Sequence, residues 1–497
     1  MQEEALAGGW RQLADEVWLG VAEWRAAHPK ATFMEIERVV EERLGVIRKR
    51  LLTDLALASG ASNLAALAEE ERPRCVECGG ELEARGQQTR ELTTLRGDVV
   101  PLRRSYAVCG VCGRGDSPLD EELALLPGSL SPSLAEGVAR LGAWIPFGQA
   151  SAALERLSGA SVSEATLRRV TLAAGAALVA LEEKAVELLQ TEAPEAPAGS
   201  GWQQVSVDGA MVPLVGGDWA EARTLVVGSL GCGRETLRAD ELSYFSRMTD
   251  HAAFTRLATL ETHRRGVERA QVVLAINDGA EWIQDLLDVQ CPEAIRILDW
   301  AHASGYVHAA GHAVFGETCG AWCSEQLHVL RAGEPIAVLA TLSELADGLA
   351  QGNTAREVVL QGLAYLAKRY EQIQYATFAQ LGYPIGSGIV ESANKLVVEA
   401  RLKGAGMHWS AANVNPLLAL RGVACSNRWD ELWPSIAAQQ RHAARVRRSC
   451  RHRERLDRPS TPRAPRPPRP LRVVDGRPTK DHPWHRYPAV RPRRAKP

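Results

Sequence analysis

The segment Val205-Ser206-Val207-Asp208-Gly209 is a short apolar run that ends in a carboxylate and a glycine. A second segment has the same form, Val272-Val273-Leu274-Ala275-Ile276-Asn277-Asp278-Gly279. Short runs rich in β-branched residues and bounded by glycine are typical of buried strands. We therefore predict that Asp208 and Asp278 lie at the carboxyl ends of neighbouring strands. The glycine after each aspartate would let the chain turn away and leave the carboxylate exposed at the sheet edge.

The segments around these two runs predict an α/β domain. We expect three consecutive strands, a helix, a strand, a helix and a last strand, at residues 203–213, 223–230, 235–245, 251–264, 271–277, 280–287 and 294–298. This is the order of elements in a ribonuclease-H-like core. Residues 301–380 have largely helical patterns. They predict a helical insertion between Asp278 and the next acidic candidate, Glu391.

Glu391 follows a glycine-rich turn, Pro384-Ile385-Gly386-Ser387-Gly388, and falls in the first turn of an expected helix. Two strand-end aspartates and a helix glutamate are a ligand set for paired Mg²⁺ (or Mn²⁺) ions, because hard cations take oxygen ligands. Asp208 as a plain turn residue, Asp278 as a helix N-cap and Glu391 as a solvated side chain remain alternatives. Glu399, two turns further along the same helix, is the rival third ligand.

Two tight cysteine pairs, Cys75-x-x-Cys78 and Cys109-x-x-Cys112, are separated by a stretch suited to short strands. Two such pairs complete a tetrahedral zinc site, which predicts a structural zinc ribbon over residues 71–125. A redox dithiol, the competing interpretation, would not need two pairs. The other cysteines are scattered, and Cys319 and Cys323 are interpreted as ordinary packing residues.

The regions on either side of the cysteine pairs are expected to be helical. Residues 1–70 have helical spacing of apolar residues, and residues 126–195 contain a helix-turn-helix pattern. Ser163 would cap its second helix, from which Arg168 and Arg169 would project toward DNA. Two core helices joined by a glycine turn are the alternative.

The net charge of −2 conceals a strongly basic C-terminus. Residues 441–497 contain 17 arginines and two lysines against four acids, with 11 of the 26 prolines. We predict a disordered Arg/Pro-rich tail over 436–497 that attracts DNA without sequence preference. A tail without a role is the alternative. No apolar run reaches about 18 residues and no signal pattern opens the chain, so a cytoplasmic, nucleoid-associated protein without membrane contact is expected.

Several motifs together resemble an ISKra-type bacterial insertion-sequence transposase, a group related to Mutator-like transposases. The motifs are Val-Ser-Val-Asp208-Gly, Ile-Asn-Asp278-Gly-Ala-Glu-Trp-Ile, Ile-Leu-Asp299-Trp-Ala-His302, Pro-Ile-Gly-Ser-Gly-Ile-Val-Glu391-Ser-Ala, Arg401-Leu-Lys-Gly-Ala-Gly-Met-His-Trp409-Ser, Leu420-Arg421 and Asn427-Arg428-Trp429-Asp430. The likeness extends over residues 72–433, and the basic tail lies outside it.

The resemblance implies a multidomain α/β enzyme, with a catalytic core at 202–310, a helical insertion at 311–380 and closing helices at 381–435. Asp208, Asp278 and Glu391 would be its Asp-Asp-Glu metal ligands, with Asp299 and His302 beside them. The implied activity is metal-dependent strand cleavage and strand transfer by a two-metal mechanism. The implied partners are the terminal inverted repeats and target DNA, bound by a homo-oligomer.

Further DNA contacts are expected on the helix that carries Glu391. Lys395, Arg401 and Lys403 are candidates for phosphate contacts, with solvated helix charges as the alternative. Trp409 is a candidate for stacking on DNA or, equally, a core residue. An inactive, domesticated DNA-binding protein and a nuclease that cuts without joining are the alternative functions.

Overall fold

The computed structural model describes residues 2–231, 237–457, 473–474, 477–478 and 482. The chain divides into two compact units, Met1–Arg445 and Val446–Pro497. It is a mixed α/β protein whose sheets contain both parallel and antiparallel strand pairs. None of the helices in the described ranges combines the length and the apolar character that a membrane span requires.

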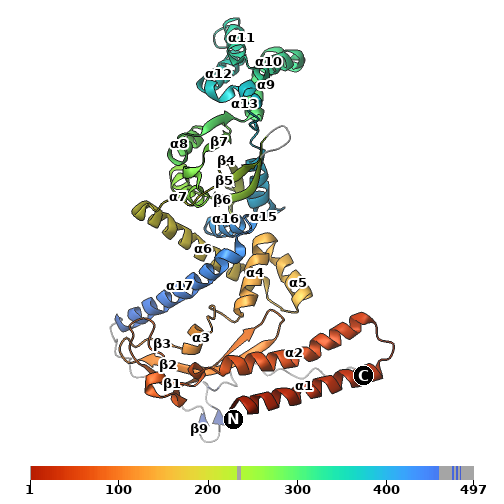
Figure 1. Cartoon of the computed structure of the whole chain (residues 1–497), viewed down its shortest axis with the longest axis vertical. Coiled ribbons are helices and arrows are strands. Elements are labelled where there is room, and N and C mark those ends of the chain that lie inside the picture. The colour runs from red at the N-terminus through yellow and green to blue at the C-terminus, as the bar shows by residue number, and fades with distance from the viewer. Residues whose placement is uncertain (1, 232–236, 458–472, 475–476, 479–481, 483–497) are drawn as a thin grey trace. The chain divides into compact units, whose positions relative to one another are not determined.

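The N-terminal part is a helical hairpin followed by a small sheet (Figure 1). α1 (Gln2–Ala27) and α2 (Phe33–Leu57) are joined by a short loop, and Thr32 and Glu35 form a capping box at the start of α2. Three 3₁₀ turns then lead into the sheet, whose strands are β1 (Leu82–Thr93), β2 (Val99–Cys109) and β3 (Gly115–Asp116). All of its strand pairs are antiparallel.

A helical layer follows the small sheet. Its helices are α3 (Pro118–Glu122), α4 (Pro132–Trp144), α5 (Phe147–Ser158) and α6 (Glu164–Glu192), together with α16 (Ala411–Cys425) and α17 (Trp429–Asp457) from the other end of the chain. One apolar cluster joins α4, α5, α6, α16 and the start of α17, so segments more than 200 residues apart in sequence share a core.

The central sheet has five strands in the order β6-β5-β4-β7-β8. The strands are β4 (Trp202–Pro213), β5 (Trp219–Gly231), β6 (Arg238–Arg247), β7 (Val272–Asn277) and β8 (Ile295–Leu298). The first three form an antiparallel meander, and β7 and β8 run parallel to β4. Gly216 and Gly217 both adopt positive φ between β4 and β5, a conformation that favours glycine. All five strands therefore fall close to their predicted positions, although residues 235 and 236 of the third lie outside the described ranges.

The two faces of this sheet carry different helices. Val205, Val207 and Ala275 pack against α7 (His251–Arg264) and α8 (Glu281–Gln290) on one face. Leu274 and Ile276 point the other way, because side chains alternate along a strand. They pack with a group of helices beyond β8. Asp208 alternates with Val205 and Val207 and therefore lies on the face opposite α7 and α8.

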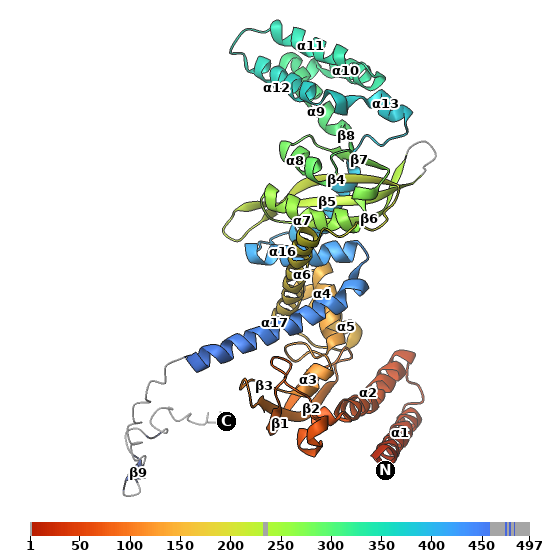
Figure 2. The same ribbon diagram turned by 60° about the vertical axis from the view of Figure 1, so that its left-hand side comes forward.

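The helical group between β8 and Gly386 contains no strand (Figure 2). It consists of α9 (Trp300–Phe315), α10 (Gly320–Ala332), α11 (Pro335–Asp347), α12 (Thr354–Lys368) and α13 (Tyr375–Gln380). The chain then returns to the sheet through α14 (Gly388–Ala393), a π-helix η7 (Asn394–Glu399) and α15 (Ala400–Leu402).

The C-terminal prediction needs a correction. α17 continues to Asp457, so the disordered tail expected from residue 436 does not begin there. The physical reason is that no proline occurs between Pro434 and Pro459, and only the later part is proline-rich. Most of the remaining tail lies outside the described residues. In the second unit, the described strands β9 (Val473–Val474) and β10 (Arg477–Pro478) pair antiparallel.

Candidate functional site

Asp208 lies inside β4, where the strand leaves its parallel neighbour. The β4–β7 ladder ends at Val205 opposite Ala275, while the β4–β5 ladder continues through Asp208 to Pro213. Asn277 accepts a hydrogen bond from the Val207 N–H through its side-chain oxygen and so closes the gap beyond the ladder. Asp208 is therefore at the end of the parallel pairing but not at the end of its strand.

Gly209 does not turn the chain, contrary to the prediction. It continues β4 opposite Arg223, and a Cβ at this position would press on the Glu221 side chain of β5, which would have to shift.

Asp278 follows β7 directly and accepts a hydrogen bond from the Ala280 N–H at 3.0 Å. The helical group holds this turn in place. Arg369, at the end of α12 and buried, donates hydrogen bonds to the Gly279 carbonyl and to Glu281 Oε1. A Cβ at Gly279 would lie 2.1 Å from the Arg369 side chain, which explains the glycine after Asp278.

Asp299 and His302 form a pair at the start of α9. Asp299 caps the helix by accepting from the His302 N–H, and its Oδ2 lies 3.1 Å from His302 Nδ1. Its other oxygen accepts from the Ser387 N–H at 2.7 Å. Burial alone would raise the pKa of Asp299, but the hydrogen bonds from His302 and Ser387 leave it lowered.

Electrostatic coupling shows that these side chains share one site. Burial raises the pKa of Asp208, and the charge of Asp278 raises it further against the opposing effects of Gly209, Asn394 and His302. The hydrogen bond with Asp299 raises the pKa of His302, and the charges of Asp278 and Asp208 act in the same direction. The charges of Asp208, Asp278 and His302 therefore act on one another at this edge of the sheet.

Asn394, which the sequence analysis did not identify, reaches this site from η7. Its Nδ2 donates to Asp208 Oδ2 at 2.9 Å, and its own Oδ1 is buried without a hydrogen-bond partner. The sequence signal was its spacing of three residues from Glu391, because such pairs share a helix face. π-helical turns occur frequently at functional sites.

The structure does not bring Glu391 into contact with the two aspartates. Glu391 is exposed on α14, and its side chain forms no hydrogen bond or ion pair with any described residue. Glu399, its rival, is engaged in an ion pair with Lys403 at 2.7 Å. Val390 and Ala393 pack against Val226 of the sheet, so α14 itself lies on the Asp208 face.

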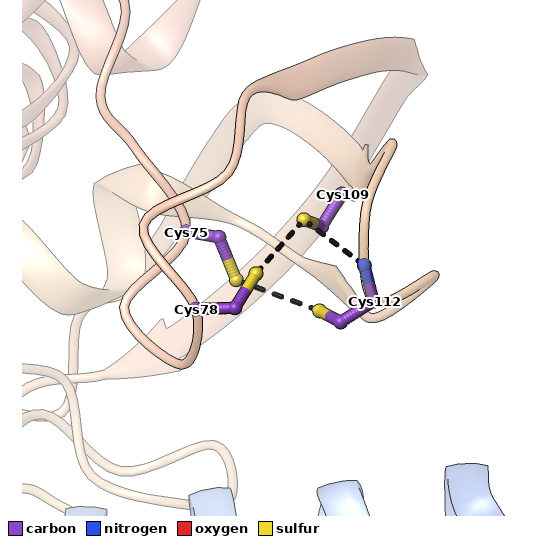
Figure 3. Close-up of side chains that lie close together, drawn as sticks. All are labelled: Cys75, Cys78, Cys109 and Cys112. Carbon is purple, nitrogen blue, oxygen red and sulfur yellow. Dashed lines mark hydrogen bonds between the residues drawn. The ribbon is translucent and has the colours of Figure 1, made fainter.

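The four cysteines lie together at one end of the small sheet (Figure 3). Their sulfur atoms are all within 4.8 Å of one another, with Cys75–Cys112 at 3.7 Å and Cys78–Cys109 at 3.5 Å. A tetrahedral zinc site with Zn–S bonds of about 2.3 Å has sulfur–sulfur edges of about 3.8 Å. These distances are far longer than a disulfide and fit a shared metal ion such as zinc.

Two equivalent backbone turns produce this arrangement. Gly79 N–H bonds the Cys75 carbonyl and Gly113 N–H bonds the Cys109 carbonyl, and both glycines have positive φ near 70°. The N–H groups of Cys112 and Val111 point at the Cys109 sulfur and lower its pKa to about 7. Cys109 therefore favours the thiolate, which is the form that binds metal, whereas burial raises the pKa of Cys112 to about 12. Within the described ranges, no other group of three or more His, Cys, Asp or Glu side chains is close enough to share an ion.

The structure buries two of the expected DNA contacts, and for Trp409 this agrees with the alternative of a core residue. The Trp409 ring packs edge-on against Phe147, and its Nε1 donates to the Leu402 carbonyl. Arg401 lies over both rings and donates to the Gly142 carbonyl, at the C-terminal end of α4. Burial lowers the pKa of Arg401 to about 10. Both residues connect α4 and α5 to the closing helices.

The other candidates are accessible to different degrees. Arg168 and Arg169 are exposed in the first turns of α6, which Ser163 caps and which follows α5 after a turn at Gly159. Lys395 is exposed on η7, whereas Lys403 is held by Glu399. α5 and α6 are also core helices, through Ala150, Leu154 and Leu167. The structure thus leaves Arg168, Arg169 and Lys395 available for a partner.

No family model matches the chain, and no curated protein matches it.

Proposed function

We propose that this chain is a DNA transposase of an insertion sequence, with Asp208 and Asp278 at the centre of a phosphoryl-transfer site. The observation that carries the proposal is the placement of these two carboxylates on neighbouring parallel strands. They are close enough for the charge of Asp278 to raise the pKa of Asp208. The strand order, an antiparallel meander followed by two parallel strands, is that of ribonuclease-H-like proteins and supports the same conclusion.

The residues of this site fit a divalent cation. Asp208 and Asp278 offer carboxylate oxygens, and the unpartnered Oδ1 of Asn394 is a further oxygen beside them. Mg²⁺ or Mn²⁺ bound there would supply charge stabilisation during displacement at a phosphodiester. Burial raises the pKa of Asp208 most and the charge of Asp278 raises it further, so a bound cation would favour the ionised form of both carboxylates.

The neighbouring side chains have separate roles in this proposal. Asp299 fixes the His302 ring, so that the imidazole, when protonated, presents its other N–H at the same edge as a donor for a phosphate oxygen. Glu391 would join the carboxylates when DNA binds, because its helix already lies on the Asp208 face and its side chain is unengaged. The accessible Arg168, Arg169 and Lys395 would contact DNA phosphates.

The four-cysteine module is proposed to be a structural zinc ribbon. A site closed by four thiolates leaves no open position for a substrate, so its zinc contributes folding energy and not catalysis. The ribbon, the α5–α6 helix-turn-helix and the closing helices would together bind the insertion-sequence ends.

One observation favours a second candidate. Glu391 stands apart from the two aspartates, which is what a transposase-derived DNA-binding protein without catalysis would tolerate. Such a protein would bind the same ends but would not need Asp208 or Asp278.

Cleavage and joining by the purified full chain distinguish these functions. Labelled duplexes from the DNA flanking the coding region are incubated with supercoiled plasmid and Mg²⁺, Mn²⁺ or EDTA. We expect metal-dependent nicking followed by joining, and a loss of roughly a thousandfold or more in Asp208→Asn and Asp278→Asn, with binding retained. Asp285→Asn, an exposed aspartate on α8, is the matched control. Cutting without joining would identify a nuclease. Binding without cutting would identify the non-catalytic protein.

A further inference from the structure

The α1–α2 hairpin leaves one apolar face of α2 exposed, without a partner among the residues that the structure describes. Among the residues of this 25-residue helix, only Val39 and Gly45 are fully buried. Phe33, Leu44 and Leu55 are exposed by 74%, 39% and 60%. Large apolar side chains gathered on one face of a helix mark an interaction surface more often than scattered ones do.

These three residues form a line along the helix. They are spaced by 11 residues, which is about three turns at 3.6 residues per turn, so they project in nearly the same direction. Glu37, Glu41 and Arg48 fall within the same sector by the same periodicity. The face is therefore an apolar stripe with charged residues between its apolar positions.

The stripe is symmetric about Leu44. Phe33 and Leu55 are equally far from it in sequence, one toward each end of the helix. If two copies of α2 pair antiparallel with Leu44 on the axis, Leu44 faces Leu44 and Phe33 of each copy faces Leu55 of the other. A patch that complements itself in this way is the mark of a twofold interface between identical chains.

The two halves of α2 differ in the sign of their net charge. The N-terminal half contains Glu35, Glu37, Glu41 and Glu42 against Arg38 and Arg43, a net charge of −2, and the C-terminal half contains Arg48, Lys49 and Arg50 against Asp54, a net charge of +2. Antiparallel pairing places the acidic half of one copy beside the basic half of the other, whereas parallel pairing places like charges together. Charge complementarity of this kind selects orientation.

α1 adds to the centre of the same surface. The Trp10 Nε1–Asp54 bond at 3.0 Å, and the close approach of Gly20 to the Arg43 guanidinium, fix the register of the hairpin. This register places Trp18, which is 67% exposed, level with Leu44. Figure 1 shows the two helices side by side along their length.

We propose that Trp18, Phe33, Leu44 and Leu55 form a homodimer interface, in which the α1–α2 hairpins of two copies pack antiparallel about a twofold axis at Leu44. The result is a four-helix bundle that buries the apolar stripe of each copy. This inference does not depend on the proposed catalytic activity, since it concerns the DNA-free protein and a surface outside the carboxylate site.

Light scattering after size exclusion and sedimentation velocity on the full chain, without DNA, test the interface. We expect a dimer at micromolar concentration. Leu44→Glu places two carboxylates against each other on the axis and should weaken dimerisation by on the order of a hundredfold or more. Val46→Glu is the matched control, since Val46 is also exposed, by 51% against 39% for Leu44, but lies on the other side of α2. Unchanged helical circular dichroism checks that each variant folds.

A charge-exchange pair tests the orientation. Phe33→Lys and Leu55→Glu should each weaken the dimer, and the double variant should recover it, because antiparallel pairing places the new lysine opposite the new glutamate. In a parallel dimer the double variant would set like charges together and would not recover. A monomeric wild-type chain at tens of micromolar, or a Leu44→Glu variant that dimerises normally, would overturn the proposal.

Discussion

Asn394 donates a hydrogen bond to Asp208 at 2.9 Å across 186 residues of sequence. The bond ties the first strand of the central sheet to a helix that returns only after the whole helical group. It also orients the carboxylate that the proposed reaction depends on most, and the amide oxygen beside it has no other described partner. Asn394 is thus a positioning residue whose loss has measurable consequences.

Asn394→Ala should lower cleavage by roughly 10–100-fold and raise the Mn²⁺ concentration needed for half-maximal activity, since residues that orient metal ligands have effects of this size. Metal titration of the cleavage rate is the measurement. Asn415→Ala is the matched control, because Asn415 forms comparable hydrogen bonds with the Met248 backbone away from the site. Equal metal dependence in the two variants would show that Asn394 is only structural.

Glu391→Gln should abolish cleavage while leaving DNA binding intact, because the proposed mechanism requires a third carboxylate from α14. Glu399→Gln should retain activity and lose only its ion pair with Lys403, a contribution of less than about 1 kcal/mol. The two variants are compared in the same cleavage assay. If Glu399→Gln abolished cleavage and Glu391→Gln did not, Glu399 would be the third carboxylate of the site.

The Asp299–His302 pair should make stability depend on pH. The pKa of His302 is raised, so its stabilisation is complete below about pH 6.5, its ordinary value, and is lost as the pH rises through the folded value. The pKa of Asp299 is lowered, so its contribution is lost instead as the pH falls below about 4.

His302→Gln should therefore destabilise the metal-free protein more at pH 6 than at pH 9. The difference should be under about 1 kcal/mol, because the ring is half exposed and solvent screens the pair. Urea unfolding at the two pH values measures it, with His308→Gln, an exposed histidine on α9, as the control. A pH-independent effect would show that His302 acts without its charge.

The cysteine cluster should hold one zinc ion per chain by elemental analysis. Cys75→Ser should release the ion and lower the melting temperature, because a closed four-thiolate site contributes folding energy. Cys450→Ser, an exposed cysteine outside the cluster, should change neither property. A purified chain without zinc that is equally stable would rule out the metal.

Combined Arg168→Ala and Arg169→Ala should weaken binding of the flanking duplex about tenfold and reduce the slope of log affinity against log salt by about 2. Lys184→Ala tests an exposed charge further along the same helix and should have little effect. Fluorescence anisotropy at several salt concentrations separates the two. An unchanged salt slope would show that Arg168 and Arg169 of α6 do not contact the DNA phosphates.

The strands and their neighbours could be predicted because the evidence for them is local. Val205–Asp208 and Val272–Asp278 have short apolar runs with glycine after the acid, and both form strands of one sheet. The range of β4 was predicted, but the turn expected at Gly209 was wrong, because a glycine after an acid signals a turn in isolation. The side chain next to Gly209 is Glu221, on the partner strand, which no local pattern reveals.

Burial could not be predicted for Arg401 and Trp409. Their segment is basic and aromatic, which is also the composition of a DNA-binding surface. Both are buried because Phe147 and Gly142, more than 250 residues earlier, pack against them. Asn394 was missed for a related reason, since a polar residue in a helix becomes informative only when its partner strand is known.

Because Asn394 follows Asp208 by 186 residues, the bond between them can form only late in synthesis. The ribosome makes both aspartates, and then the helices α9 to α13, before residue 394 exists, so a nascent chain has the carboxylates but not the helix that orients them. Under the proposed function, an unfinished chain therefore lacks an assembled site, and so does any product truncated before α14.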